Sequence, residues 1–95
     1  MEREAKREDE LEPLLRAFCS LGTPEEARAL LTDLCTPREL EDLSQRLAVA
    51  RMLADGHSYV DVSRATGASS TTVSRVSKCL NGPAGGYRLV LSRLG

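Results

Sequence analysis

Hydroxyl side chains are concentrated in one short stretch of this sequence, where six of the nine residues from Ser69 to Ser77 are serine or threonine. Arg75 lies within the stretch and Lys78 follows it directly. Serine and threonine are mediocre helix formers, so helix stability is a poor explanation for such a run. Short hydroxyls and cations can instead hydrogen-bond phosphate oxygens and the edges of bases. The stretch therefore predicts a surface that contacts DNA.

Two side chains of the preceding segment are expected to join this surface. The candidate DNA-contacting residues are Ser58, Tyr59, Ser69, Ser70, Thr71, Thr72, Ser74, Arg75 and Lys78. Ser77 is expected on the same outer face. Two cations give modest affinity per motif, so we expect two copies that read half-sites about one DNA turn apart. Two alternatives stay open, namely a polar face that is only solvated and a surface that binds protein.

The sequence offers little for other chemistry. It has one histidine, His57. The single acid near the hydroxyl run, Asp61, is better explained as a helix-capping acid. We therefore expect no enzymatic activity and no catalytic residue. Its cysteines, Cys19, Cys35 and Cys79, are odd in number and form no CxxC pair, so no metal site is expected. We expect three reduced thiols on apolar helix faces, where they act as small buried hydrophobes.

A helix that enters DNA needs a second helix to hold it, and residues 58–80 have the pattern of a helix-turn-helix. Gly67 supplies the residue that adopts positive φ in the tight turn, and Ser63 supplies the small residue where the helices cross. The inner faces are apolar as the motif requires. The inward-facing residues are expected to be Val62, Ala65, Ala68, Val73 and Val76.

Three helix starts share one pattern, a hydroxyl residue three positions before an acid. The pattern begins at Thr23, Thr36 and Ser58, and in the first two cases proline occupies the first helical position. In such a capping box the hydroxyl accepts from a free N–H while the acid reaches back. The helix after Thr36 is expected to be the longest, to be central and to stop at Gly56.

The two ends of the chain complete an all-α fold of about six helices. Apolar residues recur at helical spacing from Leu11 to Phe18, and Pro13, which fits only a first turn, puts the start of the ordered helix near residues 9–12. We expect residues 1–10 to be a charged, frayed N-terminus and residues 11–95 to form a single domain. A loop over 81–86 precedes a short last helix, which we expect to dock on a partner chain.

Charge is divided unequally along the chain. Residues 1–56 carry eight basic and thirteen acidic side chains, a balance of −5, whereas residues 57–95 carry five basic side chains and one acid, a balance of +4. The formal net charge of −1 therefore hides a basic C-terminal part, which favours a nucleic-acid partner.

Composition favours a dimer. A chain of 95 residues with 3% aromatic residues builds a thin aliphatic core, so we expect a homodimer to supply further burial. Because no segment looks like a secretion signal or a membrane span, we expect a cytoplasmic protein without a membrane partner.

Three stretches of the chain resemble the Trp-repressor-like family of the YerC/YecD type. They are residues 33–43 (DLCTPRELEDL), 45–53 (QRLAVARML) and 66–81 (TGASSTTVSRVSKCLN). The resemblance covers residues 11–94 and implies a six-helix subunit in an intertwined homodimer that regulates transcription. Residues 72–76 also resemble headpieces of the lac-repressor type, which carry a large sugar-binding domain after the motif.

The resemblance also implies an effector pocket. In the Trp repressor two arginines hold tryptophan, and these positions match Arg46 and Arg75, while Thr36 matches a further pocket position. The glycine under the indole is replaced by Val76, so we expect no tryptophan and no other cofactor, and any small-molecule effector stays unknown. The alternative for Arg46 is a salt bridge with Asp42 or another acid of its helix, and for Arg75 a phosphate contact.

The function that these features favour is a sequence-specific DNA-binding transcriptional regulator, expected to be a repressor, that acts as a homodimer on double-stranded DNA. The alternative is a protein-interaction module that keeps the helix-turn-helix fold without reading DNA, as the acidic first part of the chain suggests.

Overall fold

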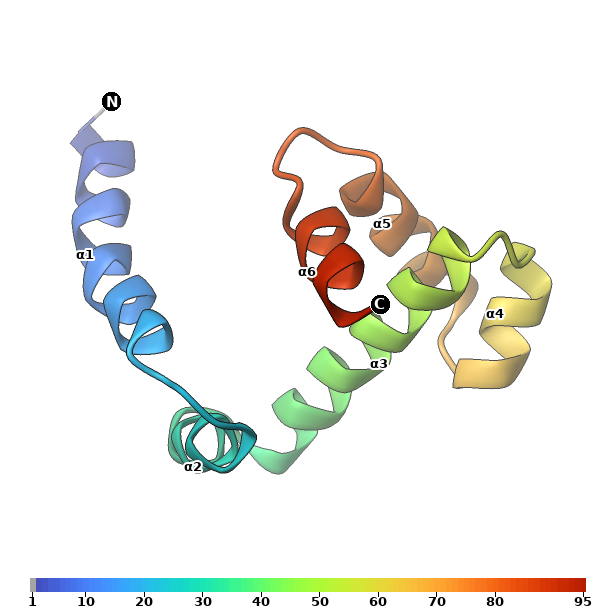
Figure 1. Ribbon diagram of the computed structural model, residues 1–95. Coiled ribbons are helices and arrows are strands. Elements are labelled where there is room, and N and C mark those ends of the chain that lie inside the picture. The colour runs from blue at the N-terminus through green and yellow to red at the C-terminus, as the bar shows by residue number, and fades with distance from the viewer. Residues whose placement is uncertain (1) are drawn as a thin grey trace. The chain divides into compact units, whose positions relative to one another are not determined.

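The computed structural model describes the backbone of residues 2–95 and the side chains from Glu10 onward, and this part of the chain forms six helices and no strand (Figure 1). The helices are α1 (Glu2–Cys19), α2 (Pro24–Leu34), α3 (Pro37–Ala54), α4 (Tyr59–Thr66), α5 (Ser70–Leu80) and α6 (Gly86–Leu94). The all-α expectation is confirmed. None of the described helices is both long enough and apolar enough to cross a membrane.

Helix α1 begins earlier than its sequence pattern indicated. It starts at Glu2 and contains Pro13 in its interior, so the expected start near residues 9–12 is wrong. The preceding residues are rich in Glu, Arg, Lys and Ala, which are good helix formers, and they extend the helix although Pro13 donates no backbone hydrogen bond. Most side chains of residues 1–10 lie outside the described residues, so the frayed N-terminus stays a prediction.

Hydroxyl caps start the helices where the sequence placed them. Thr23 Oγ1 accepts from the N–H of Glu26 at 3.1 Å, and the Glu26 carboxylate accepts from the N–H of Gly22 at 2.8 Å. Ser58 Oγ accepts from the N–H of Asp61 at 3.2 Å. Helix α3 begins directly after Thr36. It has 18 residues, as α1 does, so the expectation that it is the longest helix is wrong.

Contacts divide the chain into two compact units, one that ends at Pro37 and one over Arg38–Gly95. The second unit holds the hydrophobic core. Residues of α3, α4, α5 and the turn between α4 and α5 contribute to it. The buried cluster consists of Val49, Ala50, Val62, Ala68, Val73 and Val76. Helix α5 packs against both α4 and α6. The core therefore lies directly behind the helix-turn-helix and fixes the direction of its helices.

Helix α6 docks on its own chain. Tyr87 and Leu91 pack against the core, and the Arg88 guanidinium donates a hydrogen bond to the carbonyl of Leu80 at the end of α5. Leu89 and Val90 stay exposed. The last helix therefore does not need a partner chain in order to dock, although it leaves apolar side chains on its outer face.

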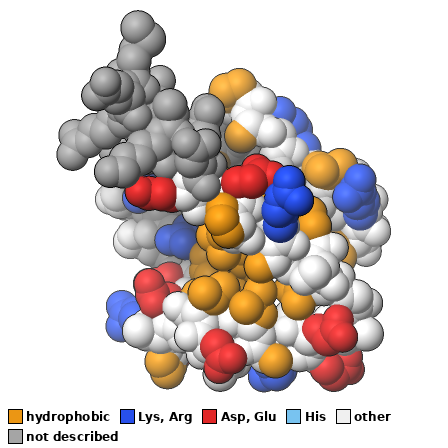
Figure 2. Space-filling model, turned by 90° about the vertical axis from the view of Figure 1, so that its left-hand side faces the viewer, with side chains coloured by type: hydrophobic (Ala, Val, Ile, Leu, Met, Phe, Trp, Pro, Cys, Tyr) orange, Lys and Arg blue, Asp and Glu red, His pale blue; other side chains and the backbone are white. Residues whose placement is uncertain are grey.

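The described side chains of the first unit form no buried core. Among the described side chains of residues 10–37 none is buried. The large hydrophobic side chains that stay exposed there are Leu11, Leu14, Leu15, Phe18 and Leu34. Figure 2 shows hydrophobic side chains at the surface of the face it displays, with acidic and basic side chains around them. A single copy of this chain therefore leaves a large apolar area in contact with water.

The cysteines differ from expectation in their burial. All three are free thiols, but Cys19 and Cys79 are exposed and Cys35 is half-buried. Cys35 follows α2 in extended backbone and so does not lie on a helix face. The expectation that the three act as buried hydrophobes is wrong for the single chain, because α1 and α5 turn these positions outward.

Candidate nucleic-acid interface

The turn between α4 and α5 is built as the sequence predicted. Gly67 has φ +75° in the left-handed region, which residues with a Cβ rarely adopt, and its N–H donates to the carbonyl of Ser63 at 2.9 Å. Ser63 Oγ donates to the carbonyl of Ala68 at 2.6 Å. Ser63 is therefore more than a small residue at a crossing, since its hydroxyl also closes the turn.

Further hydrogen bonds fix this turn to α3. Thr66 Oγ1 donates to the carbonyl of Val62 at 2.7 Å and accepts from the N–H of Ala68 at 3.2 Å. From α3, Gln45 Nε2 donates to the carbonyl of Thr66 at 3.3 Å. The end of α4 is thus held both by the turn and by the longer helix behind it.

The inner face of the motif is narrower than expected. Val62, Ala68, Val73 and Val76 are buried, but Ala65 is exposed. Helix α4 has eight residues and buries a single one, Val62, so its apolar stripe does not extend to the next turn. The assignment of Ala65 to the inner face is wrong for this reason.

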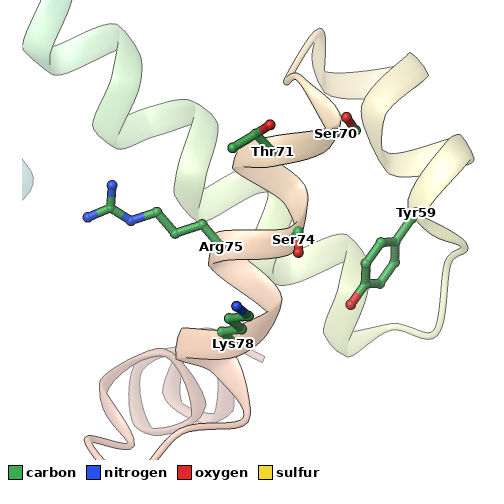
Figure 3. A pocket seen from close by; sticks show the side chains of 6 residues that line it. All are labelled: Tyr59, Ser70, Thr71, Ser74, Arg75 and Lys78. Carbon is green, nitrogen blue, oxygen red and sulfur yellow. The ribbon is translucent and has the colours of Figure 1, made fainter.

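The outer side of the motif forms an open groove of about 570 Å³. Its lining consists of Tyr59, Ser70, Thr71, Ser74, Arg75 and Lys78 (Figure 3). Figure 3 shows Ser70 and Ser74 on the side of α5 toward Tyr59, whereas Arg75 extends away from it. The groove therefore brings together six of the nine residues that were predicted to contact DNA.

The electrostatics of α5 suit an anion. Arg75 and Lys78 are exposed, and neither forms an ion pair among the described side chains. The first turn of α5 contains no acid, so no carboxylate offsets the positive end of the helix dipole. Phosphate oxygens would meet favourable charge along this surface.

Of the other three predicted residues, Ser58 and Ser69 cap helices, and Thr72 is the partner of the Ser69 cap. Ser69 Oγ accepts from the N–H of Thr72 at 3.2 Å and donates to Thr72 Oγ1 at 3.1 Å, while Ser58 caps α4. These hydroxyls hold the starts of α4 and α5 and lie outside the lining of the groove. Direct contact of these three residues with DNA stays a prediction.

Ser77, also expected on the outer face, is not among the residues that line the groove. It is half-buried, and its Oγ accepts a hydrogen bond from the phenol of Tyr59 at 2.5 Å. The pattern of polar residues along α5 could not show this contact, because the partner lies on the preceding helix.

A second hollow, of about 430 Å³, adds residues that the sequence reasoning missed. It is lined by Tyr59, Val60, Ser63, Arg64 and Ser70, and it shares Tyr59 and Ser70 with the first groove. Arg64 entered the sequence reasoning only through the charge balance. Its spacing of four residues from Val60, on one face of α4, is the signal that could have found it.

The residues of the expected effector pocket lie in both units of the chain. Arg46 is half-buried on α3 and Arg75 is exposed on α5, whereas Thr36 belongs to the first unit. Asp42, one suggested partner of Arg46, pairs instead with Arg38 at 3.4 Å. Val76 is 1% exposed and belongs to the core cluster. The pocket stays a prediction.

The sequence of this chain is similar to that of known proteins. Residues 9–95 match the family described as Trp repressor protein. The uncharacterized protein YerC of Bacillus subtilis (strain 168) is 42% identical over 94 residues, which is 99% of this chain and 90% of that protein.

Solved structures are similar over nearly the whole chain. A TrpR-like protein from Eubacterium eligens is 42% identical, with a TM-score of 0.86 and coverage of 92% of this chain and 90% of that chain. A protein from Staphylococcus aureus described as a candidate Trp repressor is 37% identical, with a TM-score of 0.87 and coverage of 99% and 94%.

Proposed function

The chain belongs to the Trp repressor protein family, with close similarity to YerC, and on that premise we propose that it is a homodimeric transcriptional regulator that binds specific DNA sequences through α4 and α5. The resemblance to the YerC-type proteins and the six-helix fold are confirmed. The proposal adds DNA as the ligand, repression as the expected effect, the dimer as the active state and the cytoplasm as its place.

One observation carries this proposal, the groove on the outer side of the helix-turn-helix. It joins hydroxyls of α5 to two exposed cations, and the core behind it holds α5, the expected recognition helix, in place. Hydroxyls and cations on a helix that fits the major groove are the side chains that read base edges and phosphates.

The dimer is supported by the apolar side chains that a single chain leaves exposed. They occur on α1 and α2 and again on α6, where Leu94 is 58% exposed. Large exposed apolar areas mark interaction surfaces. Two copies would present two recognition helices to half-sites about one turn of DNA apart, which raises affinity beyond what two cations provide.

We also propose that tryptophan does not control this protein. By the resemblance, Val76 replaces the glycine that leaves room for an indole ring, and its branched side chain is buried in the core of the motif. Thr36, Arg46 and Arg75 are the expected positions for any other small-molecule effector. The same two arginines are available for a salt bridge and for a phosphate contact.

Selection of bound sequences from a random duplex pool tests the function directly. We expect a palindromic site, followed in fluorescence anisotropy by a loss of affinity of at least tenfold between about 50 and 200 mM salt. Absence of retention from the pool even at low salt would overturn the proposal. It would favour the alternative, a protein-interaction module with this fold. The net negative charge of residues 1–56 is the observation that suggests this alternative.

A further inference from the structure

Tyr59 lines both hollows on the outer side of the helix-turn-helix. It belongs to the lining of the groove along α5 and to the lining of the hollow beside Arg64. Its residue surface is 52% exposed, although it is the first residue of α4 and lies next to α5. Figure 3 shows the ring beside α5, on the side of Ser70 and Ser74, so it forms one edge of the groove.

The polar atom of this side chain is already in use. The phenol donates to Ser77 Oγ, and Ser77 is half-buried in the C-terminal half of α5. A tyrosine in a DNA-binding protein is commonly assigned a hydrogen bond from its hydroxyl to phosphate. Here that hydroxyl joins α4 to α5 instead, and what remains for a ligand is the apolar ring.

We propose that Tyr59 is a positioning residue of the DNA surface, fixed by Ser77 so that its ring packs against the deoxyribose of the backbone without reading the sequence. This inference rests on the proposed DNA-binding function. The first helix of a helix-turn-helix crosses the backbone while the second enters the groove. The sugars are the apolar part of that backbone, and an aromatic ring supplies large contact area with little loss of side-chain freedom.

The test measures affinity for the selected duplex and for a scrambled duplex of the same length. Y59F and S77A each remove the same hydrogen bond, so each weakens both duplexes by about threefold. The double variant Y59F/S77A is no weaker than either single variant, because one bond cannot be lost twice. Y59A removes the ring and weakens both duplexes by about tenfold or more, with their affinity ratio unchanged.

Two variants serve as matched controls, Y87F on the half-buried ring of α6 and S92A on the exposed hydroxyl of the same helix. Both leave the affinity unchanged. Thermal unfolding of every variant shows whether it folds. Variants that lower only the melting temperature, with affinity at the level of the original chain, overturn the inference, since the bond would then be purely structural.

Three further outcomes contradict the proposal. If Y59F weakens binding while S77A does not, the phenol contacts DNA directly. If Y59A changes the affinity ratio, or if replacing one thymine by deoxyuridine weakens the original chain but not Y59A, the ring reads a base. If the original chain retains no DNA at all, the proposed function and this inference fail together, whereas the first two outcomes leave the function intact.

Discussion

Arg75 and Lys78 lie three residues apart on the exposed face of α5, and their chemistry differs. A planar guanidinium can bind the two acceptors of guanine, while an ammonium acts as a point charge on phosphate. We expect R75A to cost about 1–3 kcal/mol of binding free energy and to relax the sequence preference. K78A should weaken all sequences similarly and reduce the salt slope by about one.

Anisotropy against a panel of mutated sites, at several salt concentrations, separates the two residues. Arg93 on α6 is an exposed arginine outside the groove, so R93A is the control and should behave as the original chain. An unchanged sequence preference in both R75A and K78A would show that neither cation reads bases.

A second prediction concerns a single residue, Val76. On the proposal that Val76 replaces the glycine under the indole ring, about 1 mM tryptophan should leave the melting temperature unchanged, as expected for a molecule that does not bind the native state. V76G should destabilise the fold by about 2 kcal/mol, through lost burial and poor helix propensity. A rise in melting temperature of the original chain with tryptophan would contradict this prediction.

At the scale of elements, Gly67 ends α4 in a conformation that other residues rarely adopt. G67A should lower the free energy of unfolding by about 1 kcal/mol because alanine is strained at φ +75°. Gly86 is the matched control, since it is the first residue of α6 and an added Cβ would meet nothing within 4 Å. G86A should be neutral or slightly stabilising in urea unfolding.

Two adjacent serines at the start of α5 separate capping from binding. Ser69 caps the helix, whereas Ser70 lines both hollows. S69A should cost about 1 kcal/mol of stability, while S70A should keep stability and lower DNA affinity. Chemical denaturation and anisotropy on the same pair of variants test this. The reverse pattern would mean that the hydroxyl of Ser69 serves DNA rather than the helix.

Local signals explain why these elements could be predicted from the sequence. The turn at Gly67 and the caps at Thr23 and Ser58 depend on residues within a few positions of one another, and the structure has them where expected. The bond from Tyr59 to Ser77 and the exposure of Ala65 depend on how α4 lies against α5. Such tertiary placement leaves no trace in periodicity, and neither does the tolerance of α1 for Pro13.

For the whole molecule, we expect a dimer at micromolar concentration in light scattering. Phe18 is 41% exposed in the single chain and lies on the apolar stripe of α1. F18E should shift the protein toward monomer because a carboxylate is costly in an apolar interface. T32E, at an exposed polar position of α2, is the control and should stay dimeric. A monomeric original chain would contradict the prediction.

The lack of any buried side chain in residues 10–37 has a consequence for the protein's life in a cell. If a second copy buries the exposed apolar side chains of this segment, folding and dimerisation become one equilibrium. The melting temperature then rises with the total protein concentration. A newly made chain without a partner then stays open to proteases and chaperones. Degradation would then be fast at low protein concentration, where single chains predominate, and slow at high concentration, where dimers predominate. The cellular concentration of the regulator would therefore rise more than proportionally with its rate of synthesis.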